Sequence, residues 1–457
     1  MKKLFGTDGM RGLAGEFPLD EATISRVGSS LAAQFNEKSG KKARFVIGRD
    51  TRESGEWIEK AFCAGAKAIG AECASAGVMT TPGVAFLTSK LDFDAGIVIS
   101  ASHNPYEDNG IKIFSPSGKK IGEATEKIIE KDIFNKDIFN KDIFNGQLVV
   151  INRESVCDNS HIAEFQNSYL QYLSGGFKNL SLENFKMVID CANGAASRLA
   201  PRLFEKFGAE VVSINFQPDG KNINKDCGSL HLEHLQKKVS EEKADFGVAF
   251  DGDADRALFV DEKGNLVDGD ATLWIMANYL ESHGKLNNHK VVATVMSNIG
   301  LEIALKSKNI ELLRTAVGDK YVLEKLLETG ARVGGEQSGH IIFPEKSLVG
   351  DGMMTTLFLL QAIREKSVTF SEMTQGFTQF PQILVNVKVR EKLPFEEIPA
   401  IAEAAKRIEN ELGGKGRLLL RYSGTENLAR VMIEGENQTE IEAQAHRLAE
   451  IIRQNLG

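Results

Sequence analysis

Long hydrophobic runs, dense basic tracts and a signal-like start are all missing from this sequence. The longest nearly apolar run, residues 357–363, is far shorter than the ~20 residues of a membrane-spanning helix. The formal net charge is −8 and the lysines and arginines are not clustered, which argues against a nucleic-acid partner. Residues 1–12 lack the apolar core of a secretory signal, so we expect a cytoplasmic protein that does not enter a membrane.

Cysteine is also scarce, with five residues in 457. No two of them have CxxC spacing, and an odd number does not suit a framework of disulfides. We therefore expect free thiols in a reducing cytoplasm, and neither a disulfide scaffold nor a zinc site. The five are Cys63, Cys73, Cys157, Cys191 and Cys227.

The composition is that of a globular protein, with 42% hydrophobic and 26% charged residues, and the length predicts about three or four domains. Residues 43–48 have the pattern of a buried strand and residues 57–69 that of a helix, which indicates an α/β fold with a largely parallel sheet. Similar αβ units begin near residues 182 and 290. The tail differs, because its β-α-β-β-α order from residue 383 to residue 456 predicts a small α+β domain with an antiparallel sheet.

Residues 131–145 repeat KDIFN three times. A period of five matches neither a helix nor a strand, so the Ile/Phe pairs would scatter around a helix. We interpret the repeat as a neutral expansion near a domain junction. The alternative is a short contact segment for a second subunit, since exposed Ile/Phe pairs are stabilised when a partner buries them. The assembly would then be a homodimer.

Residues 96–114 combine a strand-like run with a polar break. Ser102 and His103 lie in this break, and Pro105 disfavours helix there. Lys112 follows after a glycine. Ligands bind at such strand ends in α/β sheets, so we regard Ser102 as a candidate reactive group. The alternative is an ordinary polar loop with an inert serine.

Three carboxylates follow another apolar run, at Asp251, Asp253 and Asp255. Carboxylate oxygens are the ligands that Mg²⁺ prefers, and three so close together repel one another unless a cation lies between them. A solvated acidic turn is the alternative. An EF-hand is excluded, because Arg256 stands where its loop requires glycine and a strand replaces its first helix.

Two further turns carry polar groups. Residues 334–340, GGEQSGH, place a carboxylate, an amide, a hydroxyl and an imidazole on one turn, which suits the hydroxyls of a sugar. Residues 421–426, RYSGTE, combine hydroxyls and free backbone N–H groups with arginines, which suits an oxyanion. Each turn alone is equally consistent with a polar hairpin. Arg11 has no interpretation by itself.

Five stretches together resemble the α-D-phosphohexomutases, in the order found in that family. They are FGTDGMRG, SASHNPYEDNGIKIF, FDGDADR, GGEQSGH and RYSGTENLARVMIEG. DCANGAAS, PDGKNINKDCGSLH and Gln337 are similar to the branch that acts on glucosamine phosphates, whereas the phosphomannomutase/phosphoglucomutase branch typically has methionine at the position of Gln337. The likeness extends nearly from end to end.

The resemblance implies three related αβ domains with mixed, mostly parallel sheets, plus a C-terminal α+β domain, arranged around a central cleft. The implied domains are 1–150 with a phosphoserine loop, 151–255 with a metal-binding loop, 256–373 with a sugar-binding loop, and 374–457 with a phosphate-binding loop. The implied activity is that of an isomerase of amino sugar metabolism. It would interconvert glucosamine 6-phosphate and glucosamine 1-phosphate for UDP-N-acetylglucosamine synthesis, with one Mg²⁺ per chain and glucosamine 1,6-bisphosphate or a similar hexose bisphosphate as activator.

The resemblance also implies roles for individual residues. Ser102 would carry the phosphoryl group and, with Asp251, Asp253 and Asp255, hold the metal. The other implied catalytic residues, associated with charge stabilisation and proton transfer, are Arg11, His103, Lys112, Arg256 and His340. The implied substrate-binding residues are Glu336, Ser338, Arg421, Ser423, Gly424, Thr425 and Arg430. Lys112 and His340 are alternative general bases.

Three residues depart from the family pattern. Ala254 replaces a glycine of the metal loop, which would strain the loop if that position needs a positive φ. Tyr422 and Asn427 replace two prolines of the phosphate loop, which would make that loop less rigid.

Three other functions compete with this interpretation. A phosphomannomutase/phosphoglucomutase would use the same groups. A Mg²⁺-dependent sugar phosphatase with an aspartyl nucleophile would release free phosphate without a bisphosphate activator. A non-enzymatic sugar-phosphate-binding regulator would bind without turnover.

Overall fold

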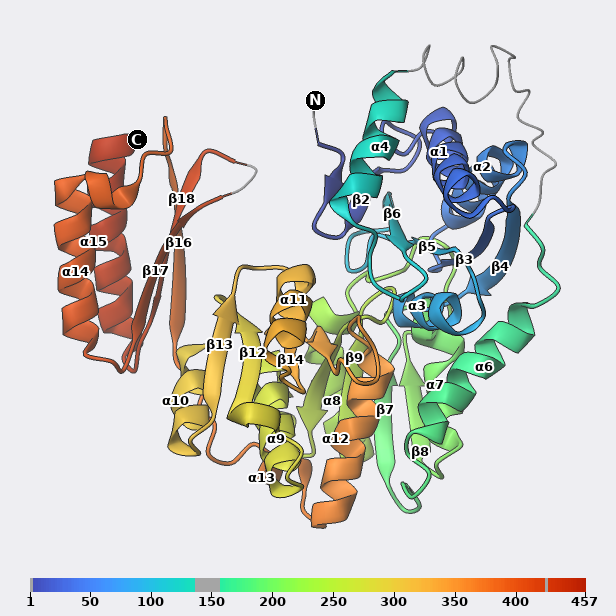
Figure 1. Ribbon diagram of the computed structural model, residues 1–457. Coiled ribbons are helices and arrows are strands. Elements are labelled where there is room, and N and C mark those ends of the chain that lie inside the picture. The colour runs from blue at the N-terminus through green and yellow to red at the C-terminus, as the bar shows by residue number, and fades with distance from the viewer. Residues whose placement is uncertain (1–2, 136–156, 424–425) are drawn as a thin grey trace. The chain divides into compact units, whose positions relative to one another are not determined.

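The computed structural model describes residues 3–135, 157–423 and 426–457, which form two compact units (Figure 1). The first unit contains residues 1–295 and 313–374, and the second contains residues 296–312 and 375–457. No helix in the described part of the chain is long and apolar enough to cross a membrane.

The first sheet of unit 1 has the strand order β1-β2-β6-β5-β3-β4. β4 and β5 are parallel to β3, whereas β6 is antiparallel to β5 and to β2. The strands are β1 (Phe5–Gly6), β2 (Gly9–Leu13), β3 (Arg44–Arg49), β4 (Glu72–Val78), β5 (Ala95–Ile99) and β6 (Asp108–Phe114). The sheet is therefore mixed, as the resemblance implied.

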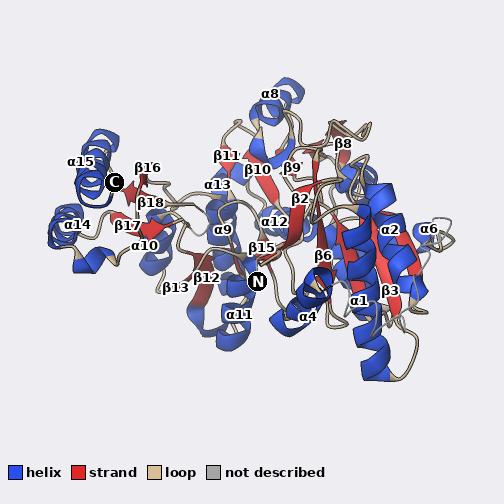
Figure 2. Ribbon diagram, turned by 90° about the horizontal axis from the view of Figure 1, so that it is seen from above, coloured by secondary structure: helices blue, strands red, loops and turns tan. Residues whose placement is uncertain are grey.

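Four helices accompany this sheet: α1 (Glu21–Ser39), α2 (Gly55–Ala68), α3 (Thr81–Lys90) and α4 (Glu123–Phe134). Figures 1 and 2 both show α1 and α2 side by side. Their backbones approach closely at Gly65, where a Cβ atom would overlap the carbonyl oxygen of Ser25. Apolar residues of α1, α2 and the strands join in one buried cluster, which makes the sheet a rigid base for the loops at its strand ends.

The second sheet of unit 1 has the order β11-β10-β9-β7-β8. β8 and β9 are parallel to β7, and β10 folds back antiparallel to β9. The strands are β7 (Lys186–Asp190), β8 (Glu210–Ile214), β9 (Phe246–Phe250), β10 (Ala257–Asp261) and β11 (Leu266–Val267), and the helices are α6 (Ile162–Gly175), α7 (Ala200–Glu205) and α8 (Glu233–Glu242). The turn from β9 to β10 carries the three predicted metal ligands.

The third sheet has the order β13-β12-β14-β15. Its strands are β12 (Lys290–Thr294), β13 (Glu311–Thr315), β14 (Gly334–Gly335) and β15 (Ile341–Ile342), and its helices are α9 (Gly269–Ser282), α11 (Asp319–Thr329), α12 (Gly352–Lys366) and α13 (Phe370–Met373). The GGEQSGH segment joins β14 to its antiparallel neighbour β15.

Unit 2 contains a three-stranded antiparallel sheet in the order β16-β18-β17. Its elements are β16 (Gln382–Lys388), β17 (Arg417–Tyr422), β18 (Leu428–Glu434), α10 (Ile299–Ser307), α14 (Pro399–Leu412) and α15 (Gln438–Leu456). The predicted α+β tail is therefore confirmed. The first helix of the tail, α14, begins with Pro399 in its first turn, and a short 3₁₀ turn, Phe395–Glu397, precedes it.

The prediction of five free thiols is wrong for two of them. The structure joins Cys63 and Cys157 in a disulfide with a Cα–Cα distance of 6.1 Å, and leaves Cys73, Cys191 and Cys227 as buried free thiols. The two partners are separated by 94 residues, so their spacing along the chain could not predict the contact.

Only the first KDIFN copy falls on described residues. It ends α4, with Ile133 buried and Phe134 exposed beside Phe17. The two halves of this Ile/Phe pair thus face different surroundings. The other copies lie outside the described residues, and the neutral-expansion and subunit-contact interpretations both stay predictions.

A buried carboxyl group links α12 to α6. The side chain of Asp351 accepts a hydrogen bond from the N–H of Met354, which caps α12, and another from the hydroxyl of Tyr169 at 2.8 Å. Burial raises the pKa of Asp351 to about 6 in spite of these donors. The proton therefore stays on this carboxyl in the folded protein at a pH where the unfolded chain has already released it.

We expect Asp351→Asn to change how stability depends on pH. As the pH rises through the interval between the unfolded and folded pKa values, the wild type loses stability at this group, whereas asparagine does not titrate. The free energy of unfolding of the variant, relative to wild type, should rise by about 2 kcal/mol between about pH 4.5 and pH 7. Urea unfolding measures it, with the exposed Asp92→Asn as a control for the lost charge; a difference that stays constant with pH would contradict the shift.

Candidate active site

Ser102 lies in the loop after β5 and its side chain is fully buried. Its backbone has φ +55°, a left-handed conformation that serine rarely adopts. The hydroxyl donates to Asp251 Oδ2 at 2.7 Å and lies 3.3 Å from His103 Nδ1. The structure therefore brings the predicted nucleophile of the first sheet to the predicted metal loop of the second.

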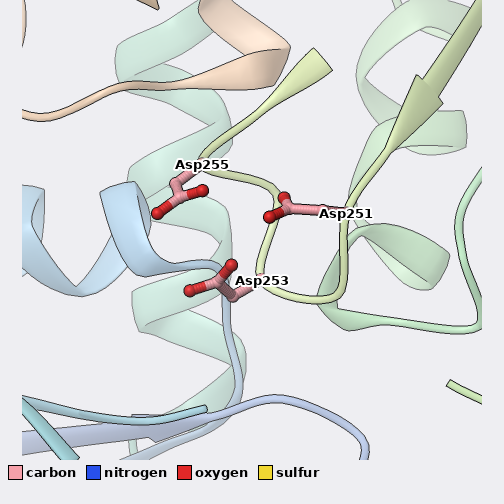
Figure 3. A group of neighbouring side chains, drawn as sticks. All are labelled: Asp251, Asp253 and Asp255. Carbon is pink, nitrogen blue, oxygen red and sulfur yellow. The ribbon is translucent and has the colours of Figure 1, made fainter. Parts of the chain in front are cut away.

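Asp251, Asp253 and Asp255 follow β9, and Figure 3 shows their carboxylates converging from one turn. One oxygen from each lies within 4.8 Å of the others, and all three residues are buried. Asp253 Oδ1 and Asp255 Oδ1 accept no hydrogen bond from the described residues. Buried carboxylate oxygens without a donor fit a hard divalent cation, so the residues present suit Mg²⁺.

Ala254 stands in the middle of this turn with φ +56°. The predicted strain at the replaced glycine is thus present, because a Cβ atom disfavours the left-handed region by roughly 1–2 kcal/mol. Within the turn, the N–H of Ala254 donates to the carbonyl of Asp251 at 3.1 Å.

The three carboxylates differ in their electrostatic surroundings. Burial, together with the charges of Asp255 and Asp253, raises the pKa of Asp251 well above its usual value. Burial acts the same way on Asp255, but Lys112 and His340 outweigh it and hold the pKa of Asp255 well below the usual value.

Lys112 projects from β6 into this acidic cluster. Its ammonium lies 2.8 Å from Asp253 Oδ2 and 3.2 Å from Asp255 Oδ2, and its side chain is 1% exposed. Burial lowers the pKa of Lys112, but the charges of Asp253, Asp255 and Asp8 raise it by more. The pKa of Lys112 therefore lies well above its usual value. The group is therefore a permanent cation at the metal loop.

A second charge network was missed by the sequence reasoning. Asp8 contacts Lys112 and Arg11, and Lys120 bridges Asp8 to Asp319 with both distances at 2.6 Å. Asp8 and Arg11 lie just before and within β2, Lys112 lies within β6 and Lys120 follows it, and Asp319 begins α11. Only the position of Asp8 within FGTDGMRG was a signal in the sequence.

Arg256 follows the metal turn and donates to His103 Nδ1 at 3.3 Å. Burial and the charges of Arg256 and Arg11 lower the pKa of His103 to about 4. His103 is therefore a neutral imidazole beside Ser102. Burial lowers the pKa of Arg256, but Asp255 and Asp251 raise it above the usual value, so the guanidinium stays charged.

His340 ends the GGEQSGH turn. The N–H of Gly350 donates to His340 Nε2 at 3.0 Å, which leaves Nδ1, 3.7 Å from Asp255, to carry the proton of the neutral ring. Burial lowers the pKa of His340, but Asp255, Asp319 and Glu336 raise it above the usual value. The ring is thus a base strengthened by neighbouring carboxylates.

A cavity of about 440 Å³ lies beside these groups. Its lining includes Asp8, Arg11, Arg256, Asp319, Glu336 and His340. Glu336 Oε1 accepts from the N–H of Gly318, and Gln337 turns away to donate to Asp268 at 3.3 Å. Ser338 is half-buried in the same turn. The cavity combines cations for a phosphate with acceptors for hydroxyl groups.

Unit 2 holds the predicted phosphate cradle. Arg421 and Arg430 face each other across β17 and β18, and Arg430 donates to Ser423 Oγ at 3.5 Å. Burial and the charge of Arg430 lower the pKa of Arg421. Like charges in a cross-strand pair destabilise a sheet, so an anion at this position would relieve them. Gly424 and Thr425 lie outside the described residues.

The two residues that replace prolines of this loop make contacts with the rest of unit 2. The ring of Tyr422 stacks on Phe395 with centroids 4.3 Å apart, and its hydroxyl donates to the carbonyl of Leu393 at 2.6 Å. The carbonyl of Asn427 accepts from the N–H of Val389. The side chain of Tyr422 thus supports one flank of the loop, whereas proline at position 427 could accept the same hydrogen bond, so the expected loss of rigidity stays a prediction.

Models of a single protein family match four parts of the chain. They are described as phosphoglucomutase/phosphomannomutase alpha/beta/alpha domain I at residues 2–139, domain II at 167–264 and domain III at 268–380, and the C-terminal domain at 384–451.

Similar proteins cover the whole chain. The phosphoglucosamine mutase of Solibacter usitatus is 47% identical over 456 residues, covering 100% of this chain and 99% of that one. The phosphoglucosamine mutase of Caldicellulosiruptor saccharolyticus is 48% identical over 461 residues, with 100% of both chains covered.

Solved structures share the fold at lower identity. A phosphoglucomutase/phosphomannomutase family protein from Burkholderia thailandensis has a TM-score of 0.78 at 22% identity, covering 100% of this chain and 99% of that one. The N-acetylphosphoglucosamine mutase of Aspergillus fumigatus, solved with GlcNAc-6P and magnesium, has a TM-score of 0.67 at 19% identity, covering 99% and 95%. Four matched domains and close relatives over the full length leave one assignment: this chain belongs to the phosphoglucomutase/phosphomannomutase family, the α-D-phosphohexomutases.

Proposed function

We propose that this enzyme is a phosphoglucosamine mutase, which interconverts glucosamine 6-phosphate and glucosamine 1-phosphate. The observation that carries the proposal is the 2.7 Å hydrogen bond from Ser102 to Asp251, which joins a buried nucleophile to a carboxylate cluster suited to a metal. The names of the relatives at 47–48% identity support the choice of substrate.

Two phosphoryl transfers balance the reaction. In the first, the bond from phosphorus to Ser102 Oγ breaks, a bond from phosphorus to O1 of glucosamine 6-phosphate forms, and O1 loses its proton. The bound 1,6-bisphosphate then reorients, so that its O6 phosphoryl group faces Ser102. In the second, the phosphoryl group on O6 returns to Ser102 Oγ, and O6 takes up a proton. Such transfers require positioning and charge neutralisation more than covalent chemistry.

Asp251, Asp253 and Asp255 would hold one Mg²⁺ together with the phosphate on Ser102. When bound, the ion supplies charge neutralisation for the transferring phosphoryl group. Arg256 and Arg11 line the cavity and Lys112 contacts Asp253, so all three add fixed positive charge near the metal loop.

The proton of the attacking hydroxyl needs an acceptor. Lys112 is a poor one, because its surrounding carboxylates raise its pKa and keep its proton in place. His340, whose pKa is raised by neighbouring carboxylates, is the better of the two candidates from the sequence. His103 would remain neutral and help to orient the seryl group.

The remaining predicted residues would bind the sugar phosphate. Glu336 would accept hydrogen bonds from the sugar hydroxyls, and Ser338 would exchange hydrogen bonds with them. The phosphate that does not react would be bound by Arg421, Ser423, Gly424, Thr425 and Arg430. The domain division 1–150, 151–255, 256–373 and 374–457 would separate these tasks. A hexose 1,6-bisphosphate would prime Ser102, and the product would feed UDP-N-acetylglucosamine synthesis in the cytoplasm.

Ser102→Ala should retain the fold and lose the mutase activity by at least about 1,000-fold, because the oxygen that gives up the phosphoryl group in the first transfer and accepts it in the second is gone. A coupled assay with glucosamine 6-phosphate and a bisphosphate activator measures the rate. The exposed Ser117→Ala is the matched control. Turnover near that of wild type in Ser102→Ala would remove Ser102 from its role.

Asp253→Asn should weaken Mg²⁺ binding by at least about 100-fold, because it removes one charged ligand from a site of three. Titration calorimetry of the unphosphorylated protein with Mg²⁺ measures the affinity independently of turnover, and the exposed Asp92→Asn is the control. Equal affinities in Asp253→Asn and wild type would make the acidic turn a structural feature alone.

A substrate panel tests the sugar. The value of kcat/KM should be at least about 100-fold higher for glucosamine 6-phosphate than for mannose 6-phosphate or glucose 6-phosphate, with isomers and not free phosphate as products. Equal values would favour a phosphomannomutase/phosphoglucomutase. Release of inorganic phosphate in step with substrate loss would favour a sugar phosphatase.

A further inference from the structure

Arg52 follows β3 and its guanidinium is fully buried against the loop that carries Ser102. All five N–H donors of this group have an acceptor. Nε donates to Asp50 Oδ2, and the two Nη atoms donate to the backbone carbonyls of Ser102, Asn104, Pro105 and Asp108. One side chain therefore gathers four carbonyl groups of a seven-residue loop around a single buried charge.

A second set of contacts reaches the N–H of Ser102. Asp50, which pairs with Arg52 at 2.8 Å, accepts a hydrogen bond from Ser100 Oγ at 2.6 Å. Ser100 Oγ in turn accepts from the N–H of Ser102 at 2.9 Å. Both polar groups of the Ser102 backbone are thus connected to the same ion pair.

Asn224 is a second side chain that contacts the loop. It lies in the long connection between β8 and α8, and its Nδ2 donates to the carbonyls of Ser102 at 2.9 Å and Asn104 at 3.1 Å. The Ser102 carbonyl consequently receives one donor from Arg52 in the first αβ region and one from Asn224 in the second.

These contacts surround a strained residue. Ser102 has φ +55°, and a backbone in that region persists only where its surroundings over-determine it. We propose that Arg52 and Asn224 are positioning residues for phosphoryl transfer, which hold the backbone of Ser102 so that its Oγ faces Asp251 and the metal loop. This inference rests on the proposed function for its kinetic readout. Neither side chain lines the cavity described above.

Arg52→Lys tests the role of the guanidinium. Lysine keeps the charge beside Asp50 but has three donors in place of five, so it cannot serve all four carbonyls. We expect kcat to fall about 100-fold, the loss typical of a nucleophile misplaced by about 1 Å, with KM for the sugar phosphate within about 2-fold of wild type. A folded variant with kcat within about 3-fold of wild type would overturn the proposal.

Arg49→Lys is the matched control. Arg49 lies three residues earlier and pairs with Glu56 and Glu59 on α2, without a contact to the Ser102 loop. It should keep the wild-type kcat. If Arg52→Lys fails to fold, Asn224→Asp carries the test. Aspartate tolerates the backbone of Asn224, at φ +57°, but presents carboxylate oxygens to two carbonyls, so kcat should again fall with KM unchanged.

Hydrogen–deuterium exchange separates this proposal from the proposed function. Amides in residues 100–108 should exchange at least about 10-fold faster in Arg52→Lys, or in Asn224→Asp, than in wild type or Arg49→Lys. Unchanged exchange in both loop variants would overturn the positioning role even if wild type is a mutase. Faster exchange would support the positioning role even if wild type converts no glucosamine phosphate. A wild type without that activity would contradict only the proposed function.

Discussion

The mutual repulsion of three buried carboxylates is the constraint on which this active site depends. Asp251, Asp253 and Asp255 lie on one turn with oxygens within 4.8 Å of each other, and burial makes their charges costly. The ammonium of Lys112 offsets part of that charge. Because Lys112 comes from β6 of the first sheet and the carboxylates from the second, the same electrostatic balance joins two αβ regions of unit 1.

Both of the loops that must meet contain a strained backbone. Ser102 and Ala254 both have a positive φ without being glycine, and each belongs to one of the two loops linked by the hydrogen bond from Ser102 to Asp251. Strain of this kind requires support from surrounding contacts. At Ser102 the support consists of the buried Arg52–Asp50 pair and Asn224, so the rigidity of the nucleophile comes from residues that never touch the substrate cavity.

Much of the fold and of the candidate site could be predicted from the sequence. The strand-helix alternation, the antiparallel tail and the serine, the acidic turn and the sugar loop are local patterns, since each occupies a few consecutive residues. Asp8, Lys120, Asp319, Arg52 and Asn224 were missed, because a charged or amide side chain in a polar stretch is ordinary until its partner is known. The prediction of free cysteines was wrong for the same reason, because the disulfide joins Cys63 and Cys157, which are 94 residues apart in the chain.

By itself the sequence determined which chemical groups are available and, through ordered motifs, the family to which the chain belongs. Only the tertiary structure decided which of those groups form ion pairs, which of them are protonated and where the backbone is strained. The physical reason is that pKa values, ion pairs and the geometry of a nucleophile depend on distances through space, and the strand order β2-β6-β5-β3 brings together residues that the chain holds far apart.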